Sequence, residues 1–291
     1  MKPAPFEYVA PESLEAALSI LRQHGYDAKL LAGGQSLIPL LNFRLAKPAV
    51  LVDLNRLTDL DFVRATPEGG LRIGAMVRQS RLESDPLVAE KVPLLAEAVP
   101  FIAHPQIRNR GTLGGTLAHA DPAAELPTVT LALQCRFRLQ SDQGDRWVAA
   151  EDFFVGLLTT ALSPEEVLAE IEIPPPTPRT GWTFLEFSRR HGDYALAGLA
   201  AGLTLDEAGI CTAARLIFLS AGDGPMVACG AAARLVGATV DGPLIEDIAR
   251  QVAQDEVAPT GDIHASAEFK RHLCRVLTAR ALQTAVGRAR S

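Results

Sequence analysis

Residues 30–41, LLAGGQSLIPLL, place two adjacent glycines, Gly33 and Gly34, between apolar runs. A second pair, Gly114 and Gly115, follows 81 residues later in residues 110–127, RGTLGGTLAHADPAAELP. Glycine has no Cβ and adopts positive φ, so several backbone N–H groups can converge on a bulky anion. An isolated pair is most often a turn. Two pairs that face each other would form a clamp around a dinucleotide pyrophosphate.

The residues beside the glycines can donate hydrogen bonds to phosphate oxygens. They are Gln35 and Ser36 in the first stretch and Thr112 and Thr116 in the second. The spacing matches neither G-x-G-x-x-G nor G-x-x-x-x-G-K-[ST], so it predicts neither a Rossmann fold nor a phosphate loop of that type. Ser36 also lacks the G-x-S-x-G context of a hydrolase nucleophile.

Three further sites have two interpretations each. Glu125 can accept hydrogen bonds from ribose or ribityl hydroxyls, or it can be an acidic residue in the first turn of a helix that starts near Pro122. Tyr194 can lie against a planar ring, or it can be a buried strand tyrosine. His119 and Asp121 can be a catalytic or metal pair, but two ligands do not make a metal site, which favours a polar loop.

Composition excludes several classes. The chain has 291 residues, 48% of them hydrophobic, with a net charge of −6, which argues against nucleic-acid binding. Its four cysteines are scattered without a CxxC, so we expect them to be buried and reduced, with no iron–sulfur or zinc site on this chain. No apolar run reaches transmembrane length and no signal core is present, which predicts a cytoplasmic protein.

The order of elements predicts an α+β protein. The first sixty residues indicate a β-α-β unit, followed by a hairpin turned at 68–70 and a helical segment over 80–103. Residues 111–116 indicate a glycine-rich loop. Four prolines within residues 173–178 indicate an extended linker, and antiparallel strands and two helices follow it.

With these motifs assembled, the chain resembles the FAD-binding medium subunits of the molybdenum hydroxylases, a family that includes carbon monoxide dehydrogenase and the flavin domain of xanthine dehydrogenase. The resemblance covers essentially the whole chain. The stretches that carry it include FEYVAPESLEAA, AKLLAGGQSLIPLLNFRLAKPAVLVDLNRL, IGAMVRQS, HPQIRNRGTLGGTLAHADPAAELP, LAEIEIPPP, FSRRHGDYALAG and HASAEFKRHLCRVLTARAL.

The resemblance implies a vanillyl-alcohol-oxidase-type FAD-binding fold of two subdomains plus a C-terminal antiparallel sheet with helices. The implied boundaries are 1–58, 59–174 and 175–291. It also implies non-covalent FAD, with no catalytic residue and no metal ligand on this chain. Gln35 and Thr116 stand where relatives often have histidine and asparagine, and Glu125 where many have aspartate. The implied FAD contacts are Lys29, Leu30, Leu31, Ala32, Gly33, Gly34, Gln35, Ser36, Ile102, Gly111, Thr112, Leu113, Gly114, Gly115, Thr116, Glu125, Leu168 and Tyr194.

In such a family the substrate reacts on a large molybdopterin-binding subunit, and electrons pass through two [2Fe–2S] clusters of a small subunit to the FAD. The implied assembly is a dimer of heterotrimers, a heterohexamer, that delivers electrons to an external acceptor. The substrate stays open, among carbon monoxide, an N-heterocycle, an aldehyde and an aromatic acyl thioester. Two alternatives are a scaffold subunit with a vestigial flavin site and a self-sufficient FAD oxidase.

Overall fold

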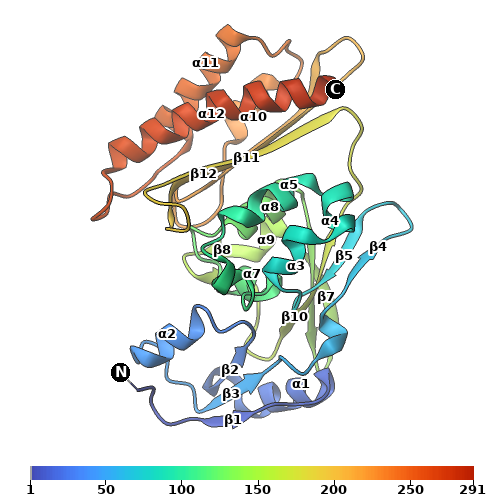
Figure 1. Ribbon diagram of the computed structural model, residues 1–291, viewed down its shortest axis with the longest axis vertical. Coiled ribbons are helices and arrows are strands. Elements are labelled where there is room, and N and C mark those ends of the chain that lie inside the picture. Colours follow the sequence, from blue (N-terminus) through green and yellow to red (C-terminus); the bar gives the residue numbers. More distant parts are fainter. Residues whose placement is uncertain (1) are drawn as a thin grey trace.

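The computed structural model describes residues 2–291 and contains three main sheets, which follow one another along the long axis of the molecule (Figure 1). The N-terminal sheet lies at one end, a five-stranded sheet lies in the middle, and the C-terminal sheet with its long helix lies at the other end. The predicted α+β class is confirmed. Within residues 2–291, no helix combines the length and the apolar character needed to cross a bilayer.

The N-terminal sheet is parallel, in the order β1-β3-β2, as a β-α-β unit requires. Helix α1 begins where the Ser13 hydroxyl accepts a hydrogen bond from the Ala16 N–H at 3.2 Å, and it ends at Gly25, whose φ is 50°. Its buried face packs Leu18 and Leu21 into the core. The elements are β1 (Glu7–Val9), α1 (Leu14–His24), η1 (Gly25–Asp27), β2 (Ala28–Leu31), α2 (Leu37–Asn42) and β3 (Val50–Asp53).

The middle sheet is antiparallel, in the order β4-β5-β10-β6-β7, so the late strand β10 lies between two earlier ones. A separate hairpin, β8-β9, follows the sheet's edge strand β7 along the chain. The strands are β4 (Val63–Ala65), β5 (Leu71–Gly74), β6 (Arg136–Ser141), β7 (Gly144–Ala149), β8 (Phe154–Gly156), β9 (Thr159–Thr160) and β10 (Val167–Ile173).

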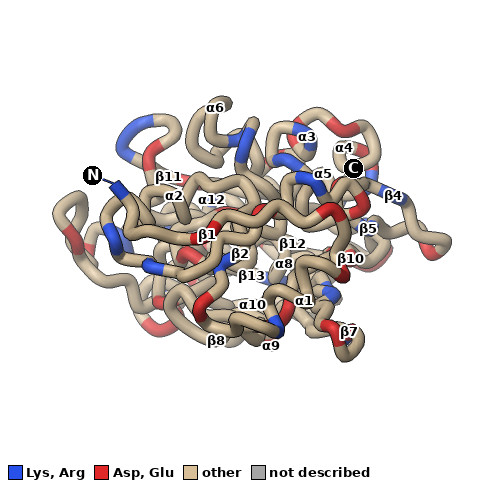
Figure 2. Tube along the Cα trace, turned by 90° about the horizontal axis from the view of Figure 1, so that it is seen from below, with Lys and Arg blue, Asp and Glu red and all other residues tan. Residues whose placement is uncertain are grey.

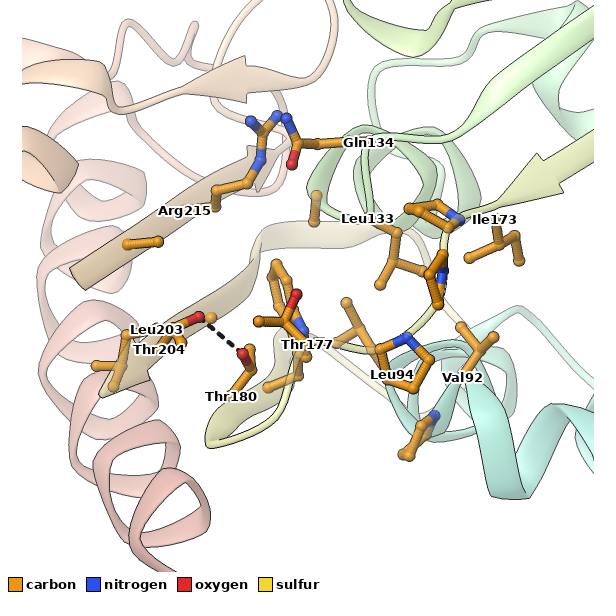
Figure 3. Close-up of a pocket in the computed structure, with 18 of the residues that line it drawn as sticks. Val92, Leu94, Leu133, Gln134, Ile173, Thr177, Thr180, Leu203, Thr204 and Arg215 are labelled. Carbon is orange, nitrogen blue, oxygen red and sulfur yellow. Dashed lines mark hydrogen bonds between the residues drawn. The ribbon is translucent and has the colours of Figure 1, made fainter. Parts of the chain in front are cut away.

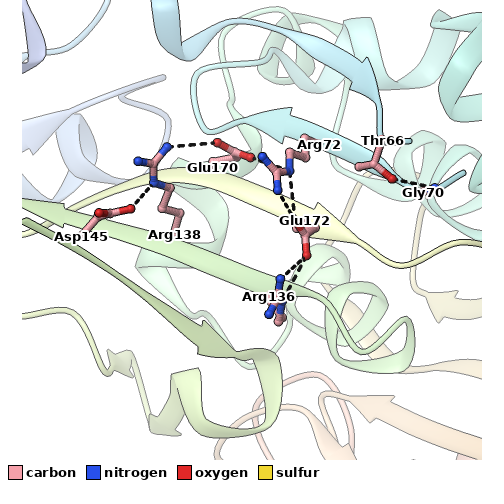
Figure 4. A network of polar contacts seen from close by, with 8 residues as sticks. All are labelled: Thr66, Gly70, Arg72, Arg136, Arg138, Asp145, Glu170 and Glu172. Atoms are coloured by element: carbon pink, nitrogen blue, oxygen red, sulfur yellow. Dashed lines mark hydrogen bonds and ion pairs between the residues drawn. The ribbon is translucent and has the colours of Figure 1, made fainter. Parts of the chain in front are cut away.

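The two faces of the middle sheet differ because strand side chains alternate. Leu71 and Ile73 are fully buried on the inner face. On the outer face Arg72 and Arg136 both bind Glu172, within a ladder of ion pairs (Figure 4). Exposed pairs of this kind contribute about 0–1 kcal/mol each, so the ladder keeps this face polar rather than supplying much stability.

Short helices cover the inner face (Figure 1). The expected helical segment over 80–103 is divided, because Pro86 and Pro93 each occupy the first turn of a new helix. The helices are η2 (Thr58–Leu60), α3 (Gln79–Ser84), α4 (Pro86–Lys91), α5 (Pro93–Ala98), η3 (Val99–Phe101), α6 (Pro105–Arg108), α7 (Leu113–His119), α8 (Glu125–Ala132) and α9 (Ala150–Phe153).

The C-terminal sheet, in the order β11-β12-β13-β14, has a helical layer on each face. Its strand β12 is therefore almost wholly buried. Helix α12 packs closely, since a Cβ on Gly181 would lie 2.0 Å from the Ala285 carbonyl oxygen. Cys229 is exposed at the start of α10, so the expectation of four buried cysteines is wrong there. The elements are β11 (Thr180–Ser188), β12 (Ala195–Leu205), β13 (Cys211–Leu219), β14 (Met226–Val227), α10 (Cys229–Leu235), α11 (Gly242–Gln251), η4 (Val252–Glu256) and α12 (Ala267–Arg290).

Charged residues of both signs are interspersed on the side of the molecule that carries the N-terminal sheet (Figure 2). Lys and Arg positions as well as Asp and Glu positions occur along the trace in this view.

Candidate functional site

The first glycine segment connects a strand to a short helix. Lys29–Leu31 belong to β2, and Ala32–Ser36 form the loop that leads into α2. Gly34 has a φ of 75°, the left-handed conformation that glycine adopts without strain. The Gln35 side-chain amide donates to the Gly33 carbonyl at 2.9 Å and stabilises the turn.

Four consecutive backbone amides of this loop have no hydrogen-bond acceptor within the described part of the chain. Among residues 2–291, the N–H groups of Gly33, Gly34, Gln35 and Ser36 donate to no other protein group. Backbone N–H groups are strong donors that are normally paired when they are withdrawn from water. Several successive free amides around a glycine turn form a concave site for an anion.

The second glycine segment is largely helical, and this corrects the expectation of a loop over 111–116. Leu113 begins α7, so Gly114 and Gly115 lie in its first turn. The Thr112 hydroxyl caps this helix by accepting a hydrogen bond from the Gly115 N–H at 3.1 Å. Glycine has a low intrinsic helix propensity, and here packing outweighs it.

The two segments touch each other. A Cβ placed on Gly33 would lie 2.3 Å from the Arg110 carbonyl oxygen and 2.7 Å from the Cα of Gly111. A Cβ on Gly115 would lie 3.3 Å from the Cβ of Ala32. Only chains without side chains at these positions can approach so closely. The condition for a clamp, that the two stretches meet, is therefore fulfilled.

Gly114 has a different role from Gly33. Its Cβ would lie 2.4 Å from the Cβ of Ala75, and its N–H donates to the Ala75 carbonyl at 2.8 Å. This glycine therefore lets α7 pack against the end of β5, and it faces the core rather than the first segment. The four central residues, Gly111 to Gly114, are buried.

The polar neighbours of the glycines are differently engaged. Thr112 acts as a helix cap, and Thr116 accepts a hydrogen bond from the Gln79 amide at 2.9 Å, so both hydroxyl protons stay available to an acceptor. Ser36 is exposed and makes no capping bond. Free amides, small hydroxyls and absent side chains together fit a diphosphate.

Glu125 and Glu186 are neighbouring acidic residues; Glu125 is buried and Glu186 is partly buried. Glu125 is the first residue of α8, three residues later than the expected start at Pro122, and is only 8% exposed. Burial raises the pKa of Glu186, and the neighbouring Glu125 raises it further. Burial likewise raises the pKa of Glu125, with a smaller contribution from Asp121. Glu125 thus begins the helix and can also present an oxygen to a ligand hydroxyl.

The three expected ring contacts lie in different environments. Ile102 and Leu168 are 7% and 5% exposed and belong to the core of the middle unit. Tyr194 is 72% exposed and immediately precedes β12, so it is not a buried strand tyrosine. Its turn reaches the segment after Ile102, because a Cβ on Gly192 would lie 2.2 Å from the His104 ring.

His119 and Asp121 do not form a metal centre. Asp121 accepts a hydrogen bond from the Ala123 N–H at 2.9 Å, as in a polar turn, and His119 ends α7. Across residues 2–291, no cluster of three or more His, Cys, Asp or Glu side chains is arranged to hold a metal ion.

A separate groove of about 170 Å³ lies along the proline linker (Figure 3). Residues of β12 and β13 line it together with Pro174–Pro176, and the Thr180 and Thr204 hydroxyls face each other there at 2.7 Å. None of its lining residues belongs to either glycine segment. The groove is therefore distinct from the candidate anion site.

Comparison with known proteins identifies the relatives of this arrangement. Residues 4–176 match the FAD binding domain in molybdopterin dehydrogenase, and residues 182–285 match the CO dehydrogenase flavoprotein C-terminal domain. The chain is 42% identical over 290 residues to the 6-hydroxypseudooxynicotine dehydrogenase complex subunit alpha of Paenarthrobacter nicotinovorans, covering 100% of this chain and 97% of that one. It is 37% identical to the carbon monoxide dehydrogenase medium chain of Afipia carboxidovorans, covering 100% of both.

The chain belongs to the FAD-binding medium subunits of the molybdenum hydroxylase family. It is therefore a flavoprotein subunit of an oxidoreductase. Carbon monoxide dehydrogenase from Hydrogenophaga pseudoflava superposes with a TM-score of 0.95 at 37% identity, covering 99% of each chain. Quinoline 2-oxidoreductase from Pseudomonas putida 86 superposes with a TM-score of 0.94 at 39% identity, covering 100% of each chain. The expected fold, an FAD-binding domain followed by an antiparallel-sheet domain, is confirmed.

Four residues of this flavoprotein site escaped sequence reasoning. Asn55, Arg78 and Gln79 contact the glycine segments, and Glu186 lies beside Glu125. Their partners lie 23 to 61 residues away along the chain, so no local spacing pattern contains them. Weak signals were present: Asn55 is a polar residue shortly after the buried strand VLVD, and Arg78 and Gln79 lie in IGAMVRQS, one of the stretches that carry the resemblance.

Proposed function

We propose that the chain holds FAD non-covalently between Gly33–Ser36 and Gly111–Thr116 and serves as the electron-transfer subunit of a molybdenum hydroxylase. When bound, FAD supplies redox chemistry between the [2Fe–2S] clusters of a partner subunit and an external electron acceptor. One observation carries the proposal. The first segment presents four successive unpaired amides at the point where it touches the second segment.

The chain's own residues bind and orient the cofactor. The amides of Gly33–Ser36 and the hydroxyls of Ser36 and Thr116 bind the diphosphate, and Glu125 accepts hydrogen bonds from ribityl hydroxyls. Ile102 and Leu168 would pack near the flavin ring, and the exposed Tyr194 would lie beside it. No proton-transfer residue is required of this chain, because the redox chemistry belongs to the cofactor.

The proposed assembly contains a large molybdopterin-binding subunit and a small [2Fe–2S] subunit, as a dimer of heterotrimers. Relatives named as subunits of dehydrogenase complexes support this assembly. We further propose domains at 1–58, 59–174 and 175–291, since each range contains one of the three main sheets.

The decisive experiment is titration of the purified full chain, stripped of flavin, with FAD while flavin fluorescence is recorded. We expect saturable binding, and release of all FAD on denaturation because the link is non-covalent. Gly33→Ala should weaken binding at least about tenfold, because its Cβ would meet the backbone of the second segment. Gly242→Ala is the matched control, since a Cβ there meets open space. Absence of saturable binding by the unmodified chain would refute the proposal.

A further inference from the structure

We infer that Asn55 and Arg78 form a brace that fixes the two glycine segments relative to each other and orients the Gly33 amide toward the diphosphate. The inference rests on the proposed FAD site and makes both side chains positioning residues. Neither side chain is in a glycine segment. Together they connect the carbonyl groups that precede Gly33 and Gly111.

Asn55 acts on the first segment. Its side-chain amide donates to the Ala32 carbonyl at 2.9 Å. The C=O and N–H of a trans peptide point in opposite directions, so the Gly33 N–H of this same peptide points away from Asn55. Asn55 thereby sets the direction of one of the four unpaired amides.

Asn55 is itself fixed by hydrogen bonds to Asp53, which Tyr8 in turn contacts. Its backbone N–H donates to the Asp53 carboxylate at 2.9 Å, and its side-chain amide donates to the same oxygen. The Tyr8 hydroxyl donates to the other Asp53 oxygen at 2.6 Å. These bonds anchor Asn55 to β3 and β1, so its orientation is fixed by the N-terminal sheet.

Arg78 contacts the residue before the second segment and connects it to Asn55. Its guanidinium donates to the Asn55 side-chain oxygen at 2.5 Å and to the Arg110 carbonyl. The planar guanidinium presents several donors in a fixed geometry, which allows one side chain to serve two acceptors. Burial lowers the pKa of Arg78, and Arg110 lowers it further, yet arginine stays protonated in proteins.

Gln79 supports the second segment from its other side. Its backbone N–H donates to the Gly111 carbonyl at 2.9 Å, and its side chain donates to Thr116 at 2.9 Å. The pair Arg78–Gln79 therefore contacts the second segment at three points. The second segment is fixed to the middle unit, and Asn55 fixes the first segment to it through Arg78.

Such a brace matters for binding because it fixes the site before the ligand arrives. A preorganised site avoids much of the conformational entropy that a mobile loop loses on binding. Removing either side chain would let the Ala32–Gly33 peptide rotate. The loss should therefore appear in FAD affinity and leave the cores of both units intact.

The test is FAD titration of the full chain carrying Asn55→Ala, Asn55→Asp, Arg78→Ala, Arg78→Lys or both alanine changes. We expect each single variant to bind FAD about tenfold more weakly. Asn55→Asp keeps the shape of the side chain but lacks the N–H group that donates to the Ala32 carbonyl. Arg78→Lys keeps the positive charge but lacks the planar group that can serve two acceptors. The double variant should lose little more than either single one, because the two residues act as a unit. Arg81→Ala, in the helix α3 that begins directly after Arg78, is the matched control.

Thermal unfolding of the flavin-free proteins separates positioning from folding. We expect the melting temperatures of the flavin-free variants to stay within a few degrees of that of the unmodified chain, while the increase caused by FAD shrinks. Unchanged FAD affinity in Asn55→Asp and Arg78→Lys, with normal binding by the unmodified chain, would overturn the brace and leave the FAD site standing. A large fall in the flavin-free melting temperature of every variant would also overturn it, because the pair would then serve folding.

Discussion

The two glycine segments look alike in sequence and behave differently in the structure. In the first, Gly33 and Gly34 form an open turn whose amides are unpaired. In the second, Gly114 and Gly115 begin a helix, and their N–H groups are engaged by Ala75 and Thr112. The same dipeptide therefore provides hydrogen-bond donors for an anion in one place and close packing in the other. A glycine pair alone does not distinguish these roles.

The largest effect should come from Gly114→Ala, in the segment that provides packing. Its Cβ would lie 2.4 Å from that of Ala75 and 2.9 Å from the Ala75 backbone, so the helix must shift. Overpacking of a core contact costs about 1–3 kcal/mol. Urea unfolding of the flavin-free chain should show a loss of that size, and Gly242→Ala should show none. Equal stability of the two variants would remove the distinction between the segments.

Ser36→Ala, in the first glycine segment, should weaken FAD binding and leave the stability of the flavin-free chain unchanged. The Ser36 hydroxyl makes no capping bond, so the melting temperature of the flavin-free chain should stay unchanged. A hydrogen bond to a charged phosphate contributes about 1.5–3 kcal/mol, which corresponds to roughly tenfold or more in FAD affinity. Fluorescence titration measures this loss, and Ser84→Ala on the exposed end of α3 serves as control. A loss of stability without loss of affinity would contradict the assignment.

The free energy of unfolding should depend on pH because of the neighbouring carboxyl groups of Glu125 and Glu186. Burial raises the pKa of Glu125 and Glu186 above the ordinary value of 4.5, so the folded chain binds more protons than the unfolded chain above that pH. The free energy of unfolding should therefore fall as pH rises from about 5 to 8. Glu186→Gln should reduce the total fall in the free energy of unfolding across this pH range by at least about 1 kcal/mol, since one pKa unit corresponds to about 1.4 kcal/mol.

The control for the pH experiment is Glu246→Gln, which changes an exposed carboxyl paired with Arg275. Urea midpoints at several pH values measure both variants. Parallel pH profiles for the unmodified chain and Glu186→Gln would show that the acidic pair does not retain protons.

The smallest effect should come from Thr112→Ala, which removes the cap of α7. Loss of an N-cap typically costs about 1 kcal/mol or less in a short helix. Differential scanning calorimetry of the flavin-free chain should detect it, and Thr112→Ser should restore it because serine also accepts the Gly115 N–H. A loss that serine does not restore would indicate methyl packing instead of capping.

Much of the fold follows from local patterns. The capped helix after Ser13, the hairpin at 68–70, the linker after Ile173 and the long C-terminal strands lie where the sequence indicates them. The two departures from the predicted elements have different causes, a long-range contact in one and local proline chemistry in the other. The chain at Gly114 is helical because Ala75 lies against it, and the segment over 80–103 breaks because two prolines each start a new helix.

The candidate site was only partly predictable because some of its contacts join residues far apart in sequence. The glycines and their polar neighbours are contiguous in sequence, so their composition reveals them. Asn55 and Arg78 contact residues 23 and 32 positions away, and nothing in their own surroundings indicates this. The sharing of the Arg78 guanidinium between Asn55 and the Arg110 carbonyl arises only when the N-terminal and middle units have packed together.

The sequence by itself determined the class of fold, the family and the two stretches able to approach an anion, because periodicity, prolines and glycines act over a few residues. Only the tertiary structure decided which glycine pair keeps its amides free and which residues hold the two stretches in place. Hydrogen bonds and close contacts depend on distances between atoms, and for segments 81 residues apart those distances are set by packing of the whole chain.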